Sequence, residues 1–257
     1  MDTRTMRRGV AIALLASGVA AASPAATPET GCPGSWIDSG EATFYDAFGQ
    51  PNACGLPLTS GEYVVAVAAA AFDGSAVCGR CLRITGPLGS VVARITDYCV
   101  GSSCRDLDLS PNAFAAIGNP LDGILSVGWE SVSCDVEGPI AFHFDAASNP
   151  YYAKIQVRNH RYGIAGLAIA EAGQPFVELD RSSDNAFEFV SGVTPIAAPL
   201  SLRVSDLHGA VVDSDDIAFT PGVLLDGAGQ FPSCPEPGSA LGGAASIGVL
   251  TLLETAR

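Results

Sequence analysis

The sequence predicts a mainly β protein with two domains, a compact barrel followed by an antiparallel β-sandwich. Three observations favour this class. The chain has 257 residues, enough for two domains of roughly 100 residues each. Seven of its eight cysteines lie between residues 32 and 134, and a break follows at residues 135–139. On both sides of that break, short β-rich apolar runs recur between glycine, proline and aspartate residues.

The N-terminus has the features of a secretory signal peptide, which we assign to residues 1–22. Three arginines precede an apolar run at residues 10–22 that ends in consecutive alanines. This run is too short to span a bilayer comfortably, which takes about 20 residues, and it lacks the polar face of a surface helix. We therefore expect a secreted, extracellular protein.

The chain is strongly acidic, with a net charge of −14, and the predicted signal peptide removes three arginines and one aspartate. The mature protein is more acidic still, and its field repels nucleic acids and anionic membranes. We expect no nucleic-acid partner, and acidic polymers such as pectin are disfavoured except at a local basic patch. Acidity with a single lysine, Lys154, would also fit salt adaptation, which says nothing about substrate.

Eight cysteines in an exported chain predict disulfides. The alternative is a metal site built on the Cys-x-x-Cys motif at residues 78–81. However, the chain has no second such motif, and its three histidines all lie in the other half. Zinc needs about four convergent ligands, so we expect no metal and no other cofactor. Eight cysteines allow 105 pairings, and spacing alone does not choose among them.

We assign residues 32–136 to the barrel domain. Its β-rich apolar runs predict strands at residues 64–72, 91–96 and 124–132. One short helix is predicted at residues 111–117, because Ser110 can cap it, Pro111 suits its first position and Gly118 ends it. Strands with a single short helix indicate a compact barrel.

Residues 137–233 form the second predicted domain, in which the alternation is clearer. Apolar residues share one face in two runs, Ile140, Phe142 and Phe144 in the first and Ala153, Ile155 and Val157 in the second. Runs at residues 167–170 and 176–179 flank a hairpin turn, and a second turn follows at residues 208–209. Short strands at this spacing favour an antiparallel sandwich.

The C-terminal residues 234–257 differ from the rest of the chain. The tripeptide Pro235-Glu236-Pro237 precedes a small apolar run and the final Arg257. This arrangement resembles a bacterial Pro-Glu-Pro sorting tail, which would retain the protein at the cell surface. The apolar run is short and Glu254 interrupts it, so a disordered terminus is an equal alternative.

Seven short motifs follow one another in an order typical of one family. They lie at residues 41–45, 52–55, 78–81, 95–97, 107–114, 129–134 and, in the second domain, 155–162. This ordered set resembles the expansins, and the last motif is similar to that of bacterial members. The resemblance covers about residues 40–233.

The resemblance implies a six-stranded double-psi β-barrel, related to family 45 glycoside hydrolases, followed by an immunoglobulin-like β-sandwich that binds carbohydrate. It also implies cysteine pairs, which are Cys54–Cys78 and Cys81–Cys134. The remaining cysteines would then form a local Cys99–Cys104 loop and a Cys32–Cys234 bridge between the ends of the mature chain.

Three side chains of the first domain match the groove residues that this family needs for loosening, namely Thr43, Asp97 and Asp108. Each aspartate alone would more often be a turn or cap residue.

Hydrolysis generally needs two carboxylates, and in the related hydrolases the counterpart of Asp108 is the acid. Asp46 is a candidate substitute base, although a turn role is favoured. An endoglucanase or a peptidoglycan lyase that uses Asp108 is therefore the enzymatic alternative.

Bacterial expansins bind cellulose on a row of three aromatic rings, which stack on the apolar faces of the sugars. Tyr151 and Tyr152 occupy the first two positions, and Asp184 occupies the third, where it cannot stack. The groove tyrosine of bacterial members is displaced by one residue, to Tyr98. Residues 154, 156 and 158 alternate on one face, which is either a solvated face or a basic strip that contains Lys154.

These observations predict a non-hydrolytic protein that binds and loosens plant-wall polysaccharide. The expected partner is cellulose or a related β-glucan, with xyloglucan and peptidoglycan as further candidates, and we expect a monomer. A surface-displayed adhesion module, which would bind cellulose without weakening it, is the third hypothesis.

Overall fold

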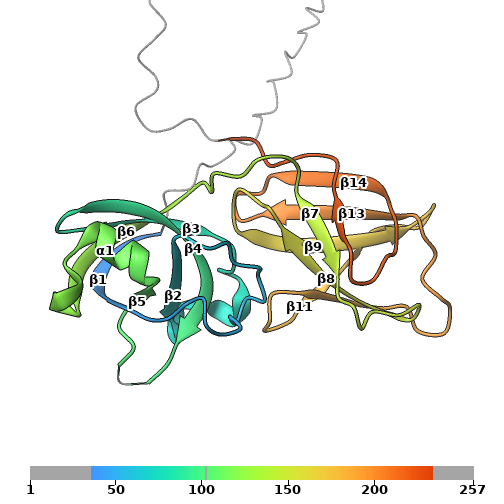
Figure 1. Cartoon of the computed structure of the whole chain (residues 1–257). Coiled ribbons are helices and arrows are strands. Elements are labelled where there is room, and N and C mark those ends of the chain that lie inside the picture. Colours follow the sequence, from blue (N-terminus) through green and yellow to red (C-terminus); the bar gives the residue numbers. More distant parts are fainter. Residues whose placement is uncertain (1–35, 102, 234–257) are drawn as a thin grey trace, which may run out of the picture.

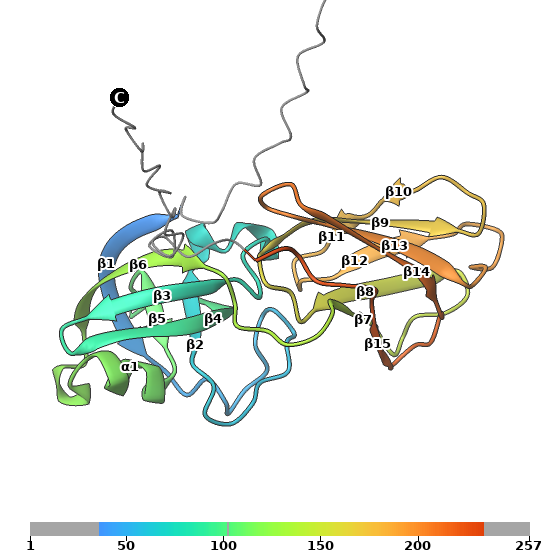
Figure 2. The same ribbon diagram turned by 90° about the horizontal axis from the view of Figure 1, so that it is seen from above.

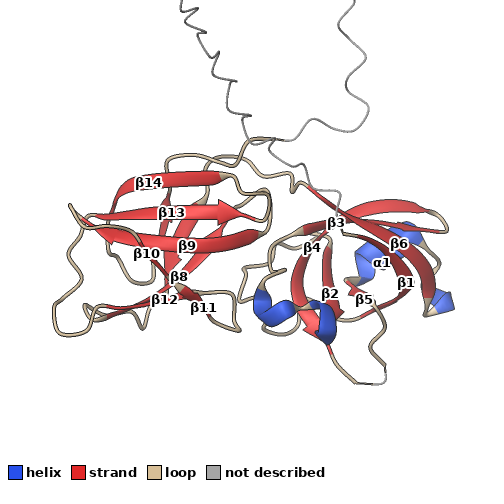
Figure 3. Ribbon diagram, turned by 180° about the vertical axis from the view of Figure 1, so that it is seen from behind, coloured by secondary structure: helices blue, strands red, loops and turns tan. Residues whose placement is uncertain are grey.

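A computed structural model describes residues 36–101 and 103–233, and two β-rich domains lie side by side in it (Figure 1). The helices of the described residues all lie in the first domain (Figure 3). The prediction of a mainly β protein, with a closed barrel followed by a sandwich, is confirmed. The predicted signal peptide, Cys32, Cys234 and the predicted sorting tail lie outside the described residues. Across the part that is described, no helix has the length and apolarity needed to cross a membrane.

Six strands close the barrel in the order β1-β5-β2-β4-β3-β6. Their bounds are β1 (Ile37–Phe44), β2 (Val64–Ala68), β3 (Cys81–Gly86), β4 (Gly89–Cys99), β5 (Leu107–Leu109) and β6 (Leu125–Val132). Strand β1 pairs with β5, and β2 with β4, in parallel, whereas the other neighbours are antiparallel. Alternate side chains such as Val65, Ile95 and Leu107 point inward and are fully buried.

Two local predictions for the barrel need correction. The run predicted as a strand at residues 64–72 leaves the sheet after Ala68, and two short 3₁₀ turns, η1 (Ala69–Ala71) and η2 (Asp73–Ser75), follow it. The predicted helix is present as α1 (Pro111–Ile117), and Ser110 occupies its N-cap position, but the Ser110 side chain makes no capping hydrogen bond. The Ser110 hydroxyl instead accepts a hydrogen bond from the backbone N–H of Val64 at 3.2 Å, so it joins the helix to β2.

Two antiparallel sheets form the second domain, in the strand orders β10-β9-β13-β14 and β11-β12-β8-β7-β15. Their bounds are β7 (Ala141–Phe144), β8 (Tyr152–Arg158), β9 (Ile164–Glu171), β10 (Val177–Glu178), β11 (Asp180–Arg181), β12 (Phe187–Val190), β13 (Leu200–Asp206), β14 (Val211–Ile217) and β15 (Leu224–Asp226). Buried residues from both sheets, such as Phe142 and Leu202, share one core. The predicted turns at 172–174 and 208–209 join the paired strands β9 and β10, and β13 and β14.

The three disulfides of the described residues have the pairing that the resemblance implied. They are Cys54–Cys78, Cys81–Cys134 and Cys99–Cys104. The two cysteines of the Cys-x-x-Cys motif therefore belong to different disulfides, so this motif holds no metal. Both of these disulfides lie close to the second domain. The backbone N–H of Cys134 donates to the carbonyl of Arg161 at 2.9 Å, and the carbonyl of Cys54 accepts from the side chain of Gln156 at 2.8 Å.

The two domains lie side by side and are joined by the short connection from β6 to β7 (Figure 2), and side chains make direct contacts between them. The hydroxyl of Ser75 donates to the carbonyl of Ser182 at 2.9 Å, and the side chain of Gln156 reaches the carbonyl of Cys54 at 2.8 Å. The imidazole of His160 packs against Gly79, where an added Cβ would lie only 2.5 Å from Cε1. These contacts hold the surfaces of the two domains in a defined relation.

Candidate functional site

Strand register brings Thr43 and Asp108 together in the barrel. They are direct partners in the parallel pair β1 and β5, so their side chains leave the sheet on the same face. The Thr43 hydroxyl donates a hydrogen bond of 2.7 Å to Oδ1 of Asp108. The closed barrel sets this register.

Asp97 reaches the same region through a β-bulge. The pairing of β2 with β4 shifts by one residue at Thr96, and beyond this shift Asp97 lies opposite Ala66. Ala66 is also the partner of Asp108 in β5. The two aspartates therefore lie two strand spacings apart, about 10 Å between their backbones.

The environments of the two aspartates differ. Asp108 is partly buried, and this burial raises its pKa, while the hydrogen bond from Thr43 opposes part of the rise. Oδ1 of Asp97 instead accepts hydrogen bonds from the backbone N–H groups of Ala53, at 3.1 Å, and Tyr98, at 2.9 Å. Asp108 is thus suited to hold a proton, whereas Asp97 anchors a neighbouring loop of the barrel.

Tyr45 is a further member of this cluster that the sequence alone did not single out. Burial raises its pKa strongly, and the charges of Asp97 and Asp108 raise it further, so the phenol remains protonated. Its buried hydroxyl lies near the side chain of Thr96, which opposes part of this rise. The available signal was its spacing, since residues two apart in an extended segment share a face and Tyr45 lies two residues beyond Thr43.

Asp46 is exposed in the turn that follows β1. Its carboxylate lies against Gly49, where an added Cβ would come within 2.5 Å of Oδ2. This position favours the turn interpretation over a role as a second base. Tyr98 is 41% exposed, and its ring packs on Phe72 with centroids 4.7 Å apart. Its role in binding stays a prediction.

The hydrogen bond between Thr43 and Asp108 gives a direct test of this geometry. We expect Thr43→Val to raise the pKa of Asp108 further, because the donor that favours its charged form is lost. Hydrogen bonds to charged groups contribute about 1.5–3 kcal/mol, so the change should be resolved by carbon-13 NMR of the side-chain carboxyl. Thr85→Val, at an exposed position on β3, is the control. An unchanged or lower pKa would contradict the assignment.

In the second domain, β8 separates a core face from an outer face. Ala153, Ile155 and Val157 are buried in the sandwich. Tyr152, half-buried, begins the outer face, and Tyr151, which is 48% exposed, lies in the turn before it. Neither tyrosine belongs to the core. Burial and the neighbouring carboxylate of Glu188 raise the pKa of Tyr152.

Gln156 does not belong to a solvated or basic strip, because it is buried, whereas the role of Lys154 in binding stays a prediction. The ammonium group of Lys154 forms an ion pair of 2.5 Å with Asp184, the residue at the third aromatic position. Burial opposes the charge of Asp184, but the hydrogen bonds from Lys154 and Ser182 outweigh it and lower the pKa. Gln156 is only 7% exposed and faces the barrel instead of solvent.

A hollow of about 300 Å³ joins the two halves of the candidate surface. Its lining comes from the barrel (Asn52, Ala53, Gly55) and from the sandwich (His143, Asp145, Lys154, Gln156, Arg158, Asp184, Ala186). Ala53 is also the residue that donates to Asp97. The hollow therefore lies between the outer face of β8 and the loop that bonds to Asp97, whereas the side chains of the polar cluster do not line it.

No protein-family model matches the chain. It is 31% identical over 164 residues to Expansin-YoaJ of Bacillus subtilis, which covers 62% of this chain and 68% of that protein. It is also 31% identical over 205 residues to Expansin-like protein 2 of Dictyostelium discoideum, which covers 75% of this chain and 50% of that protein. The chain thus spans only half the length of the Dictyostelium relative.

Two solved structures of an expansin from Clavibacter michiganensis share the fold, each with a TM-score of 0.69 over 78% of this chain and 100% of that one. One is the free protein, at 29% identity, and the other is a point mutant in complex with cellohexaose, at 27% identity. A closed barrel followed by a sandwich, with these relatives, defines a two-domain expansin-type architecture. The chain belongs to the expansin family.

Proposed function

We propose that this protein is secreted, binds cellulose or a related β-glucan and loosens it without hydrolysis. The observation that carries the proposal is the hydrogen-bonded pair of Thr43 and Asp108, which lies near Asp97 in the barrel. The cellohexaose bound to the Clavibacter structure supports a β-1,4-glucan as the ligand. Retention at the cell surface by the C-terminal tail remains part of the proposal.

The arrangement of carboxylates supports loosening over cleavage. Glycoside hydrolysis requires an acid and a second carboxylate that acts as base or nucleophile. Asp108 has the raised pKa of an acid, but Asp97 is engaged by two backbone N–H groups and Asp46 lies in its own turn. We expect Asp108 to exchange hydrogen bonds with glucan hydroxyl groups, which competes with the bonds between neighbouring glucan chains.

One combined measurement separates the three hypotheses. The purified protein is incubated with cellulose paper, and retention, released reducing sugar and tensile strength are recorded in the same samples. Retention with weakening and without sugar release supports the proposal. Sugar release would favour an endoglucanase, and retention without weakening would favour an adhesion module. Xyloglucan and peptidoglycan replace cellulose in parallel samples to test the other candidate partners.

Tyr152 offers a test of the binding face. We expect Tyr152→Ala to weaken retention on cellulose roughly two- to tenfold, because one stacked ring contributes about 0.5–1.5 kcal/mol. Binding isotherms on microcrystalline cellulose measure this change. The control is Tyr63→Ala, at an exposed tyrosine of the barrel. Equal retention of the Tyr152 variant and the wild type would remove Tyr152 from the binding face.

A further inference from the structure

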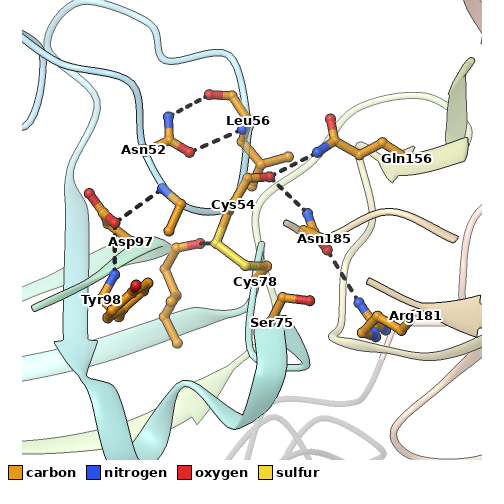
Figure 4. Close-up of a disulfide and its surroundings, with 12 residues drawn as sticks. Asn52, Cys54, Leu56, Ser75, Cys78, Asp97, Tyr98, Gln156, Arg181 and Asn185 are labelled. Carbon is orange, nitrogen blue, oxygen red and sulfur yellow. Dashed lines mark hydrogen bonds between the residues drawn. A yellow bond between two sulfur atoms is a disulfide. The ribbon is translucent and has the colours of Figure 1, made fainter. Parts of the chain in front are cut away.

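Two side chains of the second domain converge on one backbone carbonyl of the barrel, that of Cys54 (Figure 4). Nε2 of Gln156 donates to it at 2.8 Å and Nδ2 of Asn185 at 3.3 Å. Both side chains are buried, at 7% and 4% exposure. Buried amide groups without partners cost free energy, so this pair of bonds ties both residues to a single atom of the barrel.

Each amide group is oriented by a second hydrogen bond. Oε1 of Gln156 accepts from Nε of Arg158 at 2.6 Å, and Oδ1 of Asn185 accepts from Arg181 at 3.2 Å. Because these arginines donate to the oxygen of each amide, the NH₂ group of each amide faces Cys54. The two donors are therefore held in place from within the second domain.

The loop that carries Cys54, residues 52–56, behaves as a closed unit. The side chain of Asn52 donates to the carbonyl of Leu56 at 2.8 Å and accepts from its N–H at 3.1 Å. The disulfide with Cys78 anchors the middle of the loop, and the N–H of Cys54 donates to Thr96 at 3.0 Å. A displacement of the Cys54 carbonyl must therefore move the whole loop.

The same loop holds the carboxylate of Asp97. The N–H of Ala53, the residue before Cys54, donates to Oδ1 of Asp97 at 3.1 Å, and the close-up in Figure 4 shows this bond beside those to Gln156 and Asn185. A short path of hydrogen bonds thus runs from the second domain to the polar cluster of the barrel. Gln156 lies on the same strand as Tyr152, so this path begins at the candidate binding face.

We infer that Gln156 and Asn185 are positioning residues for Asp97, which they orient through the Cys54 loop. The second domain would then contribute to the geometry of the groove and would be more than a tether to the polymer. The role of Asp97 in loosening rests on the proposed function, whereas the coupling between the domains does not. Gly55 shows how tightly the two parts fit, since an added Cβ would lie 3.3 Å from Nε2 of Gln156.

The isosteric change Gln156→Glu tests the inference. It keeps the acceptor for Arg158 but replaces the donor to Cys54 by a carboxylate oxygen, which repels the carbonyl. We expect hydrogen exchange at the Ala53 amide to accelerate at least tenfold and the carboxyl carbon resonance of Asp97 to move. The resonance of Asp108, held by Thr43, should stay in place. An unchanged Ala53 amide together with an unchanged Asp97 resonance would overturn the inference.

A second variant, Gly55→Ala, disturbs the contact between Gln156 and Cys54 without altering a polar group, because its Cβ crowds the side chain of Gln156. Gly61→Ala is the matched control. Both glycines have a positive φ (59° and 86°), but a Cβ at Gly61 meets nothing within 4 Å. We expect the Asp97 resonance to move only in Gly55→Ala, and identical spectra in the two variants would also overturn the inference. Paper weakening, measured on the same samples, should fall severalfold with Gly55→Ala. If the Asp97 resonance moves in Gly55→Ala but the variant weakens paper as the wild type does, the positioning role stands and the proposed function of Asp97 in loosening is refuted.

Discussion

Replacement of Asp108 by asparagine is expected to abolish the weakening of cellulose paper. Asparagine keeps the volume of the side chain and can still accept the hydrogen bond from Thr43, so the barrel should remain folded. It cannot carry the charge or the exchangeable acid proton of the partly buried carboxyl, whose pKa is raised by burial.

The loss should be complete within the error of a tensile-strength measurement, while retention through the second domain persists. Asp122→Asn, at an exposed aspartate of the turn after α1, is the matched control and should weaken paper as the wild type does. If the Asp108 variant were fully active, Asp108 would have no place in the loosening site.

Acid should destabilise the protein through His160. This imidazole is fully buried between the domains, where burial lowers its pKa from 6.5 to about 4, and the charges of Arg94 and Arg181 act in the same direction. Nδ1 donates to the carbonyl of Tyr162 at 2.7 Å, which opposes part of this lowering of the pKa. The unfolded chain therefore binds a proton that the folded protein excludes.

This difference in proton binding sets the direction in which stability changes with pH. The stabilising contribution is fully present above pH 6.5 and is lost as the pH falls toward 4, by roughly 3 kcal/mol in the free energy of unfolding. Urea unfolding of the wild type and of His160→Gln at several pH values between 4 and 7 measures it. In His160→Gln, the free energy of unfolding should no longer show this loss between pH 6.5 and 4, whereas His208→Gln should show it as the wild type does. Parallel curves for the wild type and His160→Gln would show that His160 does not cause the loss.

Local sequence patterns were sufficient for much of the architecture. Alternation along residues 140–144 and 153–157 predicted strands whose apolar faces are in the sandwich core, because a two-residue period leaves few other solutions. Pro111 and Gly118 bounded the single α-helix of the described residues correctly. The cysteine pairs came from the family resemblance, since spacing alone left every pairing open.

The sequence did not predict side-chain contacts between residues that are distant in the chain. Lys154 and Gln156 were predicted to belong to a solvated or basic face. In the structure, Asp184 forms an ion pair with Lys154, and Gln156 is buried against Cys54. These partners lie 30 and 102 residues away in the chain, so no local pattern contains them. Ser110 likewise had the sequence context of a helix cap, but the nearby N–H of Val64 competed for its hydroxyl.

The opening prediction of a barrel followed by a sandwich was thus determined by the sequence itself, through the period of its apolar residues and the order of its motifs. Only the tertiary structure decided how the site is assembled. Barrel closure sets Thr43 against Asp108, the bulge at Thr96 turns Asp97 to the same region, and the second domain bonds to the loop that holds Asp97. The physical reason is that register, bulges and domain contacts depend on strands distant in sequence, whereas periodicity depends on neighbours.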